Sequence, residues 1–271
     1  MAISHYNTSF GVRSYEIGRY GIISAGTLLR YLEHVATEAS AAAGFPRSWY
    51  DEQHSAWVVR QMTLELTRPI TLADDLAFDT WPAQYARIQA YREYIVSSQR
   101  DDQPLARAHG HWVYVNRDRG LPIRLPAHIV EQAIPDPQMV SFPPLPAITP
   151  LSDGPLTFEL SFPARYSEAD IVGHINNTIY MDWLEEAVHS ALAQIPYARL
   201  PPESEHQRGR RTSLQRGAID YMKPSIPGDH LLIQSTLKGS YQHGLAWSQT
   251  IQRAASEEPL VRADTFWAWL D

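Results

Sequence analysis

Apolar residues recur at spacings of three and four in two long segments of the chain, which is the pattern of one face of an α-helix. The first helix is expected over about residues 24–43 and the second over about residues 177–193. Ser24 is a natural N-cap for the first helix and Gly44 would end it, while Asn176 or Asn177 would cap the second. The stripe residues are Leu28, Leu32, Val35, Ala36 and Ala39, and then Tyr180, Trp183, Leu184, Ala187, Val188 and Ala191.

One strand-like segment precedes each expected helix, and four follow it. The leading strands are expected at 6–12 and 156–162. The following strands are expected at 57–66, 75–81, 90–98 and 106–115, and at 211–221, 230–237, 245–253 and 261–270. Turn-forming residues such as Pro227-Gly228-Asp229 separate them. One long helix followed by a run of antiparallel strands predicts an α+β fold in which each sheet wraps its helix.

The two halves of the chain also repeat one another in sequence. Arg13, Glu16, Gly21 and Glu33 recur as Arg165, Glu168, Gly173 and Glu185, each 152 residues later. Further along, matches such as Trp112 with Trp267 are 155 residues apart, as one three-residue loop insertion would produce. Matches in the same order across both halves predict two related domains that arose by duplication.

A proline-rich segment separates the two halves. Seven prolines lie in residues 135–155, counting Pro135 and Pro155, too many for the interior of a helix or strand. We therefore expect an N-terminal domain over 1–134, a stiff, extended linker over 135–155 and a C-terminal domain over 156–271. The 271 residues are enough for two domains that each bury a core.

Composition excludes several classes of function. The chain has 23 basic and 30 acidic residues and a net charge of −7, so no general nucleic-acid-binding surface is expected. It has no cysteine, which excludes disulfides, thiolate metal sites and a cysteine nucleophile. No apolar run approaches the roughly 18 residues of a membrane span. The first ten residues lack the pattern of a signal peptide, so we expect a cytoplasmic protein.

Residues that could carry chemistry gather just before the second helix. They are Asp170, His174, Asn176 and Asn177, all within eight residues. In the first half, the positions of Asp170 and His174 hold Gly18 and Ile22. One half has kept an acid and an imidazole that the other half lacks, so we expect the reactive site in the second domain.

These segments resemble the acyl-[acyl-carrier-protein] thioesterases, a family built from two tandem hotdog domains. In the first half the resemblance rests on Arg13-Ser14-Tyr15-Glu16-Ile17-Gly18 and Trp57-Val58-Val59-Arg60-Gln61-Met62. In the second half it rests on Asp170-x-x-x-His174-x-Asn176-Asn177-x-x-Tyr180-x-x-Trp183. The resemblance covers nearly the whole chain. It implies hydrolysis of the thioester that joins a fatty acyl chain to its carrier protein, with no cofactor, catalysis in the second domain and acyl-chain selection largely in the first.

The chain departs from the plant members of that family at two places. An asparagine that lies midway between their catalytic acid and histidine is Val172 here. A Glu-Cys pair expected further on falls on Pro224-Ser225. The four-residue network of the plant members therefore cannot be carried over whole. A simpler site centred on one aspartate, as in single-domain hotdog thioesterases, is expected instead.

Thioester hydrolysis needs a base that activates water and dipoles that stabilise the oxyanion. Asp170 could be the base, and His174 could relay a proton or position the carbonyl group. Backbone N–H groups at the start of the second helix could form the oxyanion hole. The alternative is structural: Asp170 would be a turn residue, and Asn176 and Asn177 would be helix caps. Glu168 recurs as Glu16, which favours a structural role.

Three other groups of residues are candidates for binding. Trp57, Met62 and Trp81 could line an acyl pocket, or they could be ordinary core residues. A basic cluster that includes Arg208, Arg210 and Arg211 could dock an acidic carrier protein, or it could be a solvated loop. His109 and His111 would share one face of a strand, but no further ligands are indicated, so no metal site is expected.

We therefore expect a thioesterase that releases free fatty acid from acyl carrier protein. One alternative is an acyl-CoA thioesterase with the same site, and another is an acyl-binding hotdog protein without turnover. A hotdog dehydratase is disfavoured because its His-Pro signature is absent. Two fused hotdog domains mimic the usual hotdog dimer, so the chain is expected to be either a monomer or a homodimer.

Overall fold

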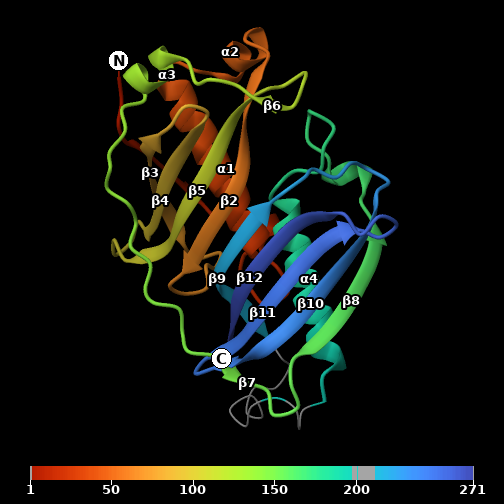
Figure 1. The fold of residues 1–271 in the computed structure, drawn as a ribbon. Coiled ribbons are helices and arrows are strands. Elements are labelled where there is room, and N and C mark those ends of the chain that lie inside the picture. Colours follow the sequence, from red (N-terminus) through yellow and green to blue (C-terminus); the bar gives the residue numbers. More distant parts are fainter. Residues whose placement is uncertain (1, 197–199, 201–210, 271) are drawn as a thin grey trace. The chain divides into compact units, whose positions relative to one another are not determined.

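The computed structural model describes residues 2–196, 200 and 211–270 (Figure 1). The described residues divide into two compact units. The first comprises the chain up to Ile23 together with Leu28–Phe142, and the second comprises Ser24–Thr27 together with the chain from Pro143 onward. None of the helices in this described part is long and apolar enough to cross a membrane.

The first unit is one long helix on an antiparallel sheet (Figure 1). Its strands are β1 (Tyr6–Gly11), β2 (Ser55–Leu66), β3 (Asp75–Tyr85), β4 (Gln89–Ser98), β5 (Pro104–Asn116) and the short β6 (Leu121–Pro122). Its helices are α1 (Ala25–Ala42), α2 (Arg47–Glu52), α3 (Ala127–Gln132) and the 3₁₀ turn η1 (Ser14–Glu16). The main strands are ordered β1-β3-β4-β5-β2. Tyr31 on α1 contacts the rings of Phe10 on β1 and Phe78 on β3, so the helix packs on this sheet.

The second unit repeats this plan. It contains β7 (Thr149–Pro150), β8 (Leu156–Pro163), η2 (Tyr166–Glu168), α4 (Ile179–Gln194), β9 (Thr212–Tyr221), β10 (His230–Tyr241), β11 (Gly244–Arg253) and β12 (Pro259–Trp269). The main strands are ordered β9-β12-β11-β10-β8, and β7 pairs with the far end of β10. Gln249 on β11 donates a hydrogen bond to the Leu184 carbonyl of α4 at 3.0 Å, which ties the helix to the sheet.

The expected elements agree with the observed ones. Both long helices, both leading strands and all eight following strands are present, with ends that differ by a few residues, and they confirm the α+β class. Leu28, Leu32, Val35 and Ala39 of the expected α1 stripe are buried. The two six-residue helices α2 and α3 were not expected. They are too short to carry a periodic pattern, and each starts directly after a proline.

The first part of the proline-rich segment is hydrogen-bonded to the first unit and does not simply connect the two units. Residues 135–148 form no helix or strand, but hydrogen bonds attach the first part of the segment to the sheet of the first unit. The Asp136 amide donates to the Pro82 carbonyl at 2.9 Å, and the Trp81 indole donates to the Gln138 carbonyl at 2.7 Å. The Val140 amide donates to the buried Glu93 carboxylate at 3.2 Å. The chain leaves the first unit only after Phe142.

The loop that leads into the long helix has the same backbone in both units. The Gly18 amide donates to the Ile22 carbonyl at 2.8 Å, and the Asp170 amide donates to the His174 carbonyl at 2.8 Å. The glycine before Ile22 and the glycine before His174 both have positive φ, +78° for Gly21 and +89° for Gly173. The duplication read from the sequence is therefore also a duplication of hydrogen bonds, and only the side chains on the loop differ.

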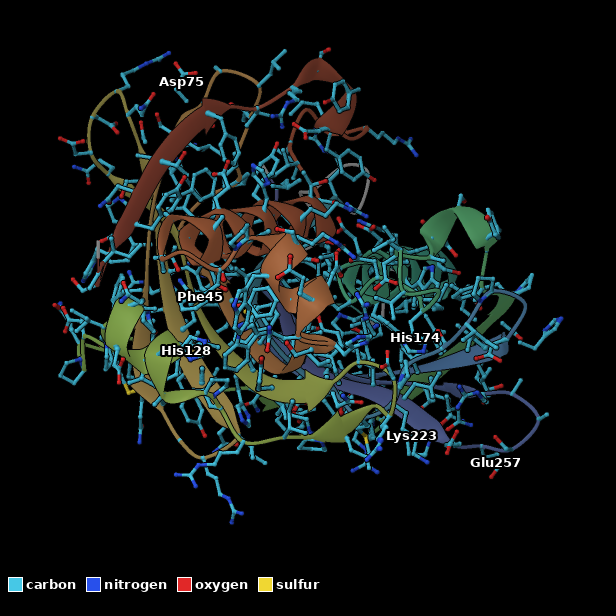
Figure 2. All side chains as sticks on the ribbon, turned by 90° about the horizontal axis from the view of Figure 1, so that it is seen from above. Phe45, Asp75, His128, His174, Lys223 and Glu257 are labelled. Carbon is cyan, nitrogen blue, oxygen red and sulfur yellow. The ribbon has the colours of Figure 1, made fainter. Side chains whose placement is uncertain are left out.

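The core of the first unit ends in an aromatic cluster. Phe45, just after α1, packs against Trp49 of α2 and His128 of α3, with ring centroids 5.0 and 5.6 Å away. Figure 2 labels Phe45 and His128, which lie side by side. The two short helices therefore close one end of the first unit's core.

Candidate active site

Asp170 lies on the loop between η2 and α4, and one of its carboxylate oxygens is used by the loop itself. Oδ1 accepts hydrogen bonds from the Val172 amide at 2.8 Å and the His174 amide at 3.3 Å. Oδ2 accepts no hydrogen bond from the residues that the structure describes. The side chain is only partly buried. One oxygen therefore fixes the carboxylate on the loop, and the other is unbonded within the described part of the chain.

His174, labelled in Figure 2, lies four residues further on, close to the start of α4. Its side chain is exposed, and within the described part of the chain its imidazole makes no hydrogen bond, to Asp170 or to any other residue. The two side chains thus do not form a preassembled Asp–His dyad. The nearby Ile171 and Val172 side chains are also exposed, by 78 % and 47 %.

The two asparagines differ in their surroundings. Asn176 Oδ1 accepts hydrogen bonds from the Thr178 amide at 2.9 Å and the Thr178 hydroxyl at 2.7 Å. These bonds fix the turn before α4, whose N-cap residue is Thr178 and not the expected Asn176 or Asn177. Ser24 does cap α1, because its Oγ accepts a hydrogen bond from the Thr27 amide at 3.0 Å. Asn177 Oδ1 is buried and has no partner among the described residues. A buried, unpaired acceptor is costly, which makes Asn177 the less easily explained of the two.

Glu168 and Trp183 attach the start of this loop to α4. The Arg165 amide donates to Glu168 Oε2 at 2.7 Å, and the Trp183 indole donates to Glu168 Oε1 at 3.2 Å. The first unit has the same arrangement, in which Tyr31 donates to Glu16 at 2.5 Å. Because the arrangement occurs in both units, it holds the loop rather than carrying chemistry, as the recurrence of this glutamate in the sequence indicated.

Tyr180 and Ser225 hold the other end of the loop, and the sequence analysis did not single them out as site residues. The Ser225 amide donates to the Tyr180 hydroxyl at 2.8 Å, and the two hydroxyls are 3.0 Å apart. The Ser225 carbonyl accepts from the Ile175 amide at 2.9 Å, directly after His174. Burial raises the pKa of Tyr180, so its hydroxyl stays protonated. A residue-by-residue comparison of the two halves would have found this pair.

The three candidate acyl-pocket residues do not lie together. Met62 pairs with Gly110 and Trp57 pairs with Tyr114, so both side chains lie on one face of the sheet. Trp81 pairs with Glu93, which pairs with His109, and these residues lie on the opposite face. There Trp81 stacks on His5, with ring centroids 4.7 Å apart. Trp57 and Met62 remain candidates, whereas Trp81 has the partners of a structural residue.

The basic cluster and the two histidines complete the set of candidate residues. Arg208 and Arg210 lie outside the described residues, and Arg211 directly precedes β9. His109 and His111 do share one face, because Tyr91 stacks on both rings. His109 binds Glu93 at 2.5 Å and His111 binds Gln89 at 2.8 Å. Among the described residues, no group of three or more histidines and carboxylates could hold a metal ion.

Comparison with known proteins identifies the family of this chain. The model of the acyl-ACP thioesterase N-terminal domain matches residues 4–133, and that of the C-terminal domain matches residues 155–196. An oleoyl-acyl carrier protein thioesterase of Coriandrum sativum is 25 % identical over 197 residues, which is 68 % of this chain and 53 % of that protein. The chain spans about half the length of the first curated relatives it matches, 53 to 56 %.

Solved structures share the fold along almost the whole chain. An acyl-ACP thioesterase from Bacteroides thetaiotaomicron has a TM-score of 0.72 at 20 % identity, covering 97 % of both chains. The 12:0-ACP thioesterase from Umbellularia californica has a TM-score of 0.72 at 17 % identity, covering 98 % of this chain and 94 % of that one. These likenesses confirm the tandem hotdog fold. With both of its domain models matched in order, the chain belongs to the acyl-ACP thioesterase family.

Proposed function

We propose that this protein hydrolyses the thioester between a fatty acyl chain and its carrier protein, releasing free fatty acid. The observation that carries the proposal is the contrast between the two loops. Their backbones are the same, but only the second carries a carboxylate with an unshared oxygen, followed by an exposed imidazole. Family membership supplies the substrate class, and the loop supplies the residues.

Asp170 is the general base in this mechanism. Its Oδ2 accepts a proton from a water molecule, whose oxygen attacks the carbonyl carbon of the thioester. Oδ1 keeps its bonds to the Val172 and His174 amides during this step, so the carboxylate does not need to reorient. The tetrahedral intermediate then expels the pantetheine sulfur as a thiolate, which takes up a proton to become the free thiol.

The start of α4 stabilises the oxyanion. The Asn177 amide precedes the helix and donates to no acceptor in the described part of the chain, and it lies at the positive end of the helix dipole. Asn176 holds this turn in place through its bonds to Thr178, and His174, which has no competing partner among the described residues, supplies the proton to the departing thiolate. These roles explain why the first unit, with Gly18 and Ile22, would be inactive.

The first experiment measures free-thiol release from a panel of acyl-ACP and acyl-CoA thioesters. Asp170→Asn keeps an oxygen for the two loop amides but removes the base, so kcat should fall by about a hundredfold or more while the protein stays folded. Asp118→Asn, which changes an exposed carboxylate in the first unit, is the matched control and should match wild type. Full activity in Asp170→Asn would refute the base assignment. Hydrolysis of acyl-CoA in preference to acyl-ACP would refute the carrier assignment.

A further inference from the structure

Tyr180 and Ser225 form a polar pair in the interior of the second unit. Tyr180 is 2 % exposed and Ser225 is 0 % exposed. The pair bridges α4 and the turn after β9, and through the Ser225 carbonyl it reaches the Ile175 amide. The residues that follow the candidate acid and imidazole are thus attached to the helix through two successive hydrogen bonds.

The first unit makes the same loop without these polar groups. At the spacings that relate the two halves, Tyr180 corresponds to Leu28 and Ser225 to Ile70, and both of these are 0 % exposed. The backbone bond is nevertheless kept, since the Ile23 amide donates to the Ile70 carbonyl at 3.0 Å. A buried leucine and isoleucine are therefore sufficient for this part of the fold.

This internal comparison removes the usual structural explanation for the pair. Taking two hydroxyls out of water is costly unless they are hydrogen-bonded, and an apolar pair of similar size would pack there without that cost. The unit without the candidate chemistry has the apolar pair, and the unit with it has the polar one. The polar pair is therefore found where the candidate site is found, although both units have the same fold.

We propose that Tyr180 and Ser225 are positioning residues for turnover at the loop that bears Asp170 and His174. The inference rests on the proposed function: the two hydroxyls tie the Pro224–Ser225 turn to α4, and so limit the motion of the loop that presents His174 beyond what the shared backbone bond does. Neither touches substrate, because both are buried. The Ser225 hydroxyl is no nucleophile, since it lies in the interior and is bonded to Tyr180.

The test installs the pair of the first unit in the second. Tyr180→Leu with Ser225→Ile removes both hydroxyls together, so no hydroxyl is left without its partner. We expect a melting temperature within a few degrees of wild type, kcat lowered about tenfold or more, and KM changed less than threefold. A loop that binds substrate but presents the reacting groups poorly gives this split between kcat and KM.

Two further variants make the result decisive. Tyr180→Phe with Ser225→Ala keeps the side-chain volumes and should show the same kcat loss, even where the Leu–Ile pair fails to fold. Tyr31→Phe deletes a buried tyrosine hydroxyl from the matching helix of the first unit, where it binds Glu16, and should leave kcat within twofold of wild type.

The outcomes separate this inference from the proposed function. Wild-type kcat in the Phe–Ala variant, with Asp170→Asn inactive, overturns the positioning role and leaves the function standing. An equal kcat loss in Tyr31→Phe also overturns it, because loss of any buried hydroxyl would then suffice. A wild-type protein that hydrolyses no thioester overturns the proposed function and the positioning role together.

Discussion

His5 shows how a single residue can tie distant parts of a unit together. Its Nδ1 binds the Asp79 carboxylate at 2.9 Å and its Nε2 binds that of Asp136 at 3.1 Å. The ring also stacks on Trp81. The imidazole thus joins the N-terminal segment, β3 and the proline-rich segment. Nothing in the local sequence around His5 predicts this, because its two acidic partners lie 74 and 131 residues away.

The contribution of His5 to stability should depend on pH. Burial disfavours the imidazolium, but the carboxylates of Asp136 and Asp79 outweigh burial and raise the pKa of His5 above its ordinary 6.5. The stabilisation is therefore complete below about pH 6.5 and is lost as the pH rises through the folded-state pKa. We expect His5→Gln to reduce the free energy of unfolding by about 0.5 kcal/mol more at pH 5.5 than at pH 8.5. Denaturant unfolding at both values measures this.

A variant of one of the two carboxylates that contact His5 provides the control for this prediction. In an Asp136→Asn background, the difference between pH 5.5 and 8.5 should shrink, since one of the two charges that raise the pKa is gone. A His5→Gln effect that is the same at both pH values would contradict the assignment.

The residues of the candidate site were partly predictable from the sequence. Asp170, His174 and the two asparagines lie within eight positions of one another, so their motif could be read along the chain. Tyr180 and Ser225 are 45 residues apart, and only the packing of the turn after β9 against α4 brings them together. Trp81 was grouped with Trp57 and Met62 from residue type alone, and the register of the strands separates it from them.

At the scale of elements, the loop before each long helix requires one residue in a left-handed backbone conformation. Gly21 and Gly173 have φ values of +78° and +89°, where a side chain is strained. A Cβ at either position would meet no atom within 4 Å, so the cost of a substitution lies in the backbone and not in a clash. The two glycines thus form a matched pair, one on the candidate site and one on its degenerate copy.

Gly173→Ala and Gly21→Ala should separate stability from activity. Each should lower the free energy of unfolding by about 1–2 kcal/mol, the cost of a left-handed conformation for a residue with a Cβ. Only Gly173→Ala should also reduce kcat, by about tenfold or more, because only its loop carries Asp170 and His174. Chemical denaturation and thiol-release assays on both variants test this. Equal kcat losses in both variants would show that the effect reports folding alone.

Sequence periodicity determined most elements, for a physical reason. A helix or strand with one buried face must repeat apolar residues at its own period, so the long helices and the main strands are visible in a single sequence. A β-bulge is not visible in this way. The shift between Val59 and Gln61 puts Trp57 and Met62 on one face, although strict alternation would put residues five apart on opposite faces.

At the scale of the whole molecule, the net charge affects how an acidic carrier protein could bind. The chain carries a net charge of −7, so an acidic carrier protein needs a local basic surface to approach the site. Arg208, Arg210 and Arg211 are the basic residues closest together in the second half. Their task as a docking site remains a prediction.

Reversing these charges should weaken binding of the carrier protein and leave the hydrolysis step unchanged. We expect the triple change of Arg208, Arg210 and Arg211 to Glu to lower kcat/KM for acyl-ACP about tenfold at low salt, with a smaller difference at 0.5 M salt because exposed charges are screened there. Arg262→Glu, an exposed position on β12, is the control. An uncharged acyl thioester without a carrier should be hydrolysed equally well by all three proteins. A loss with that substrate too would point to damage of the site instead of docking.

The sequence by itself determined the duplication, the long helices, the main strands and the loop that bears Asp170 and His174. Each of these is a pattern of neighbouring residues or a repeat at a fixed spacing, so it can be recognised in the sequence without the structure. Only the tertiary structure decided which face Trp81 occupies, that the Asp170 carboxylate and the His174 imidazole are not hydrogen-bonded to each other, and that the Tyr180 hydroxyl binds Ser225. Those facts depend on strand register and on contacts between residues far apart in the chain, which no local pattern encodes.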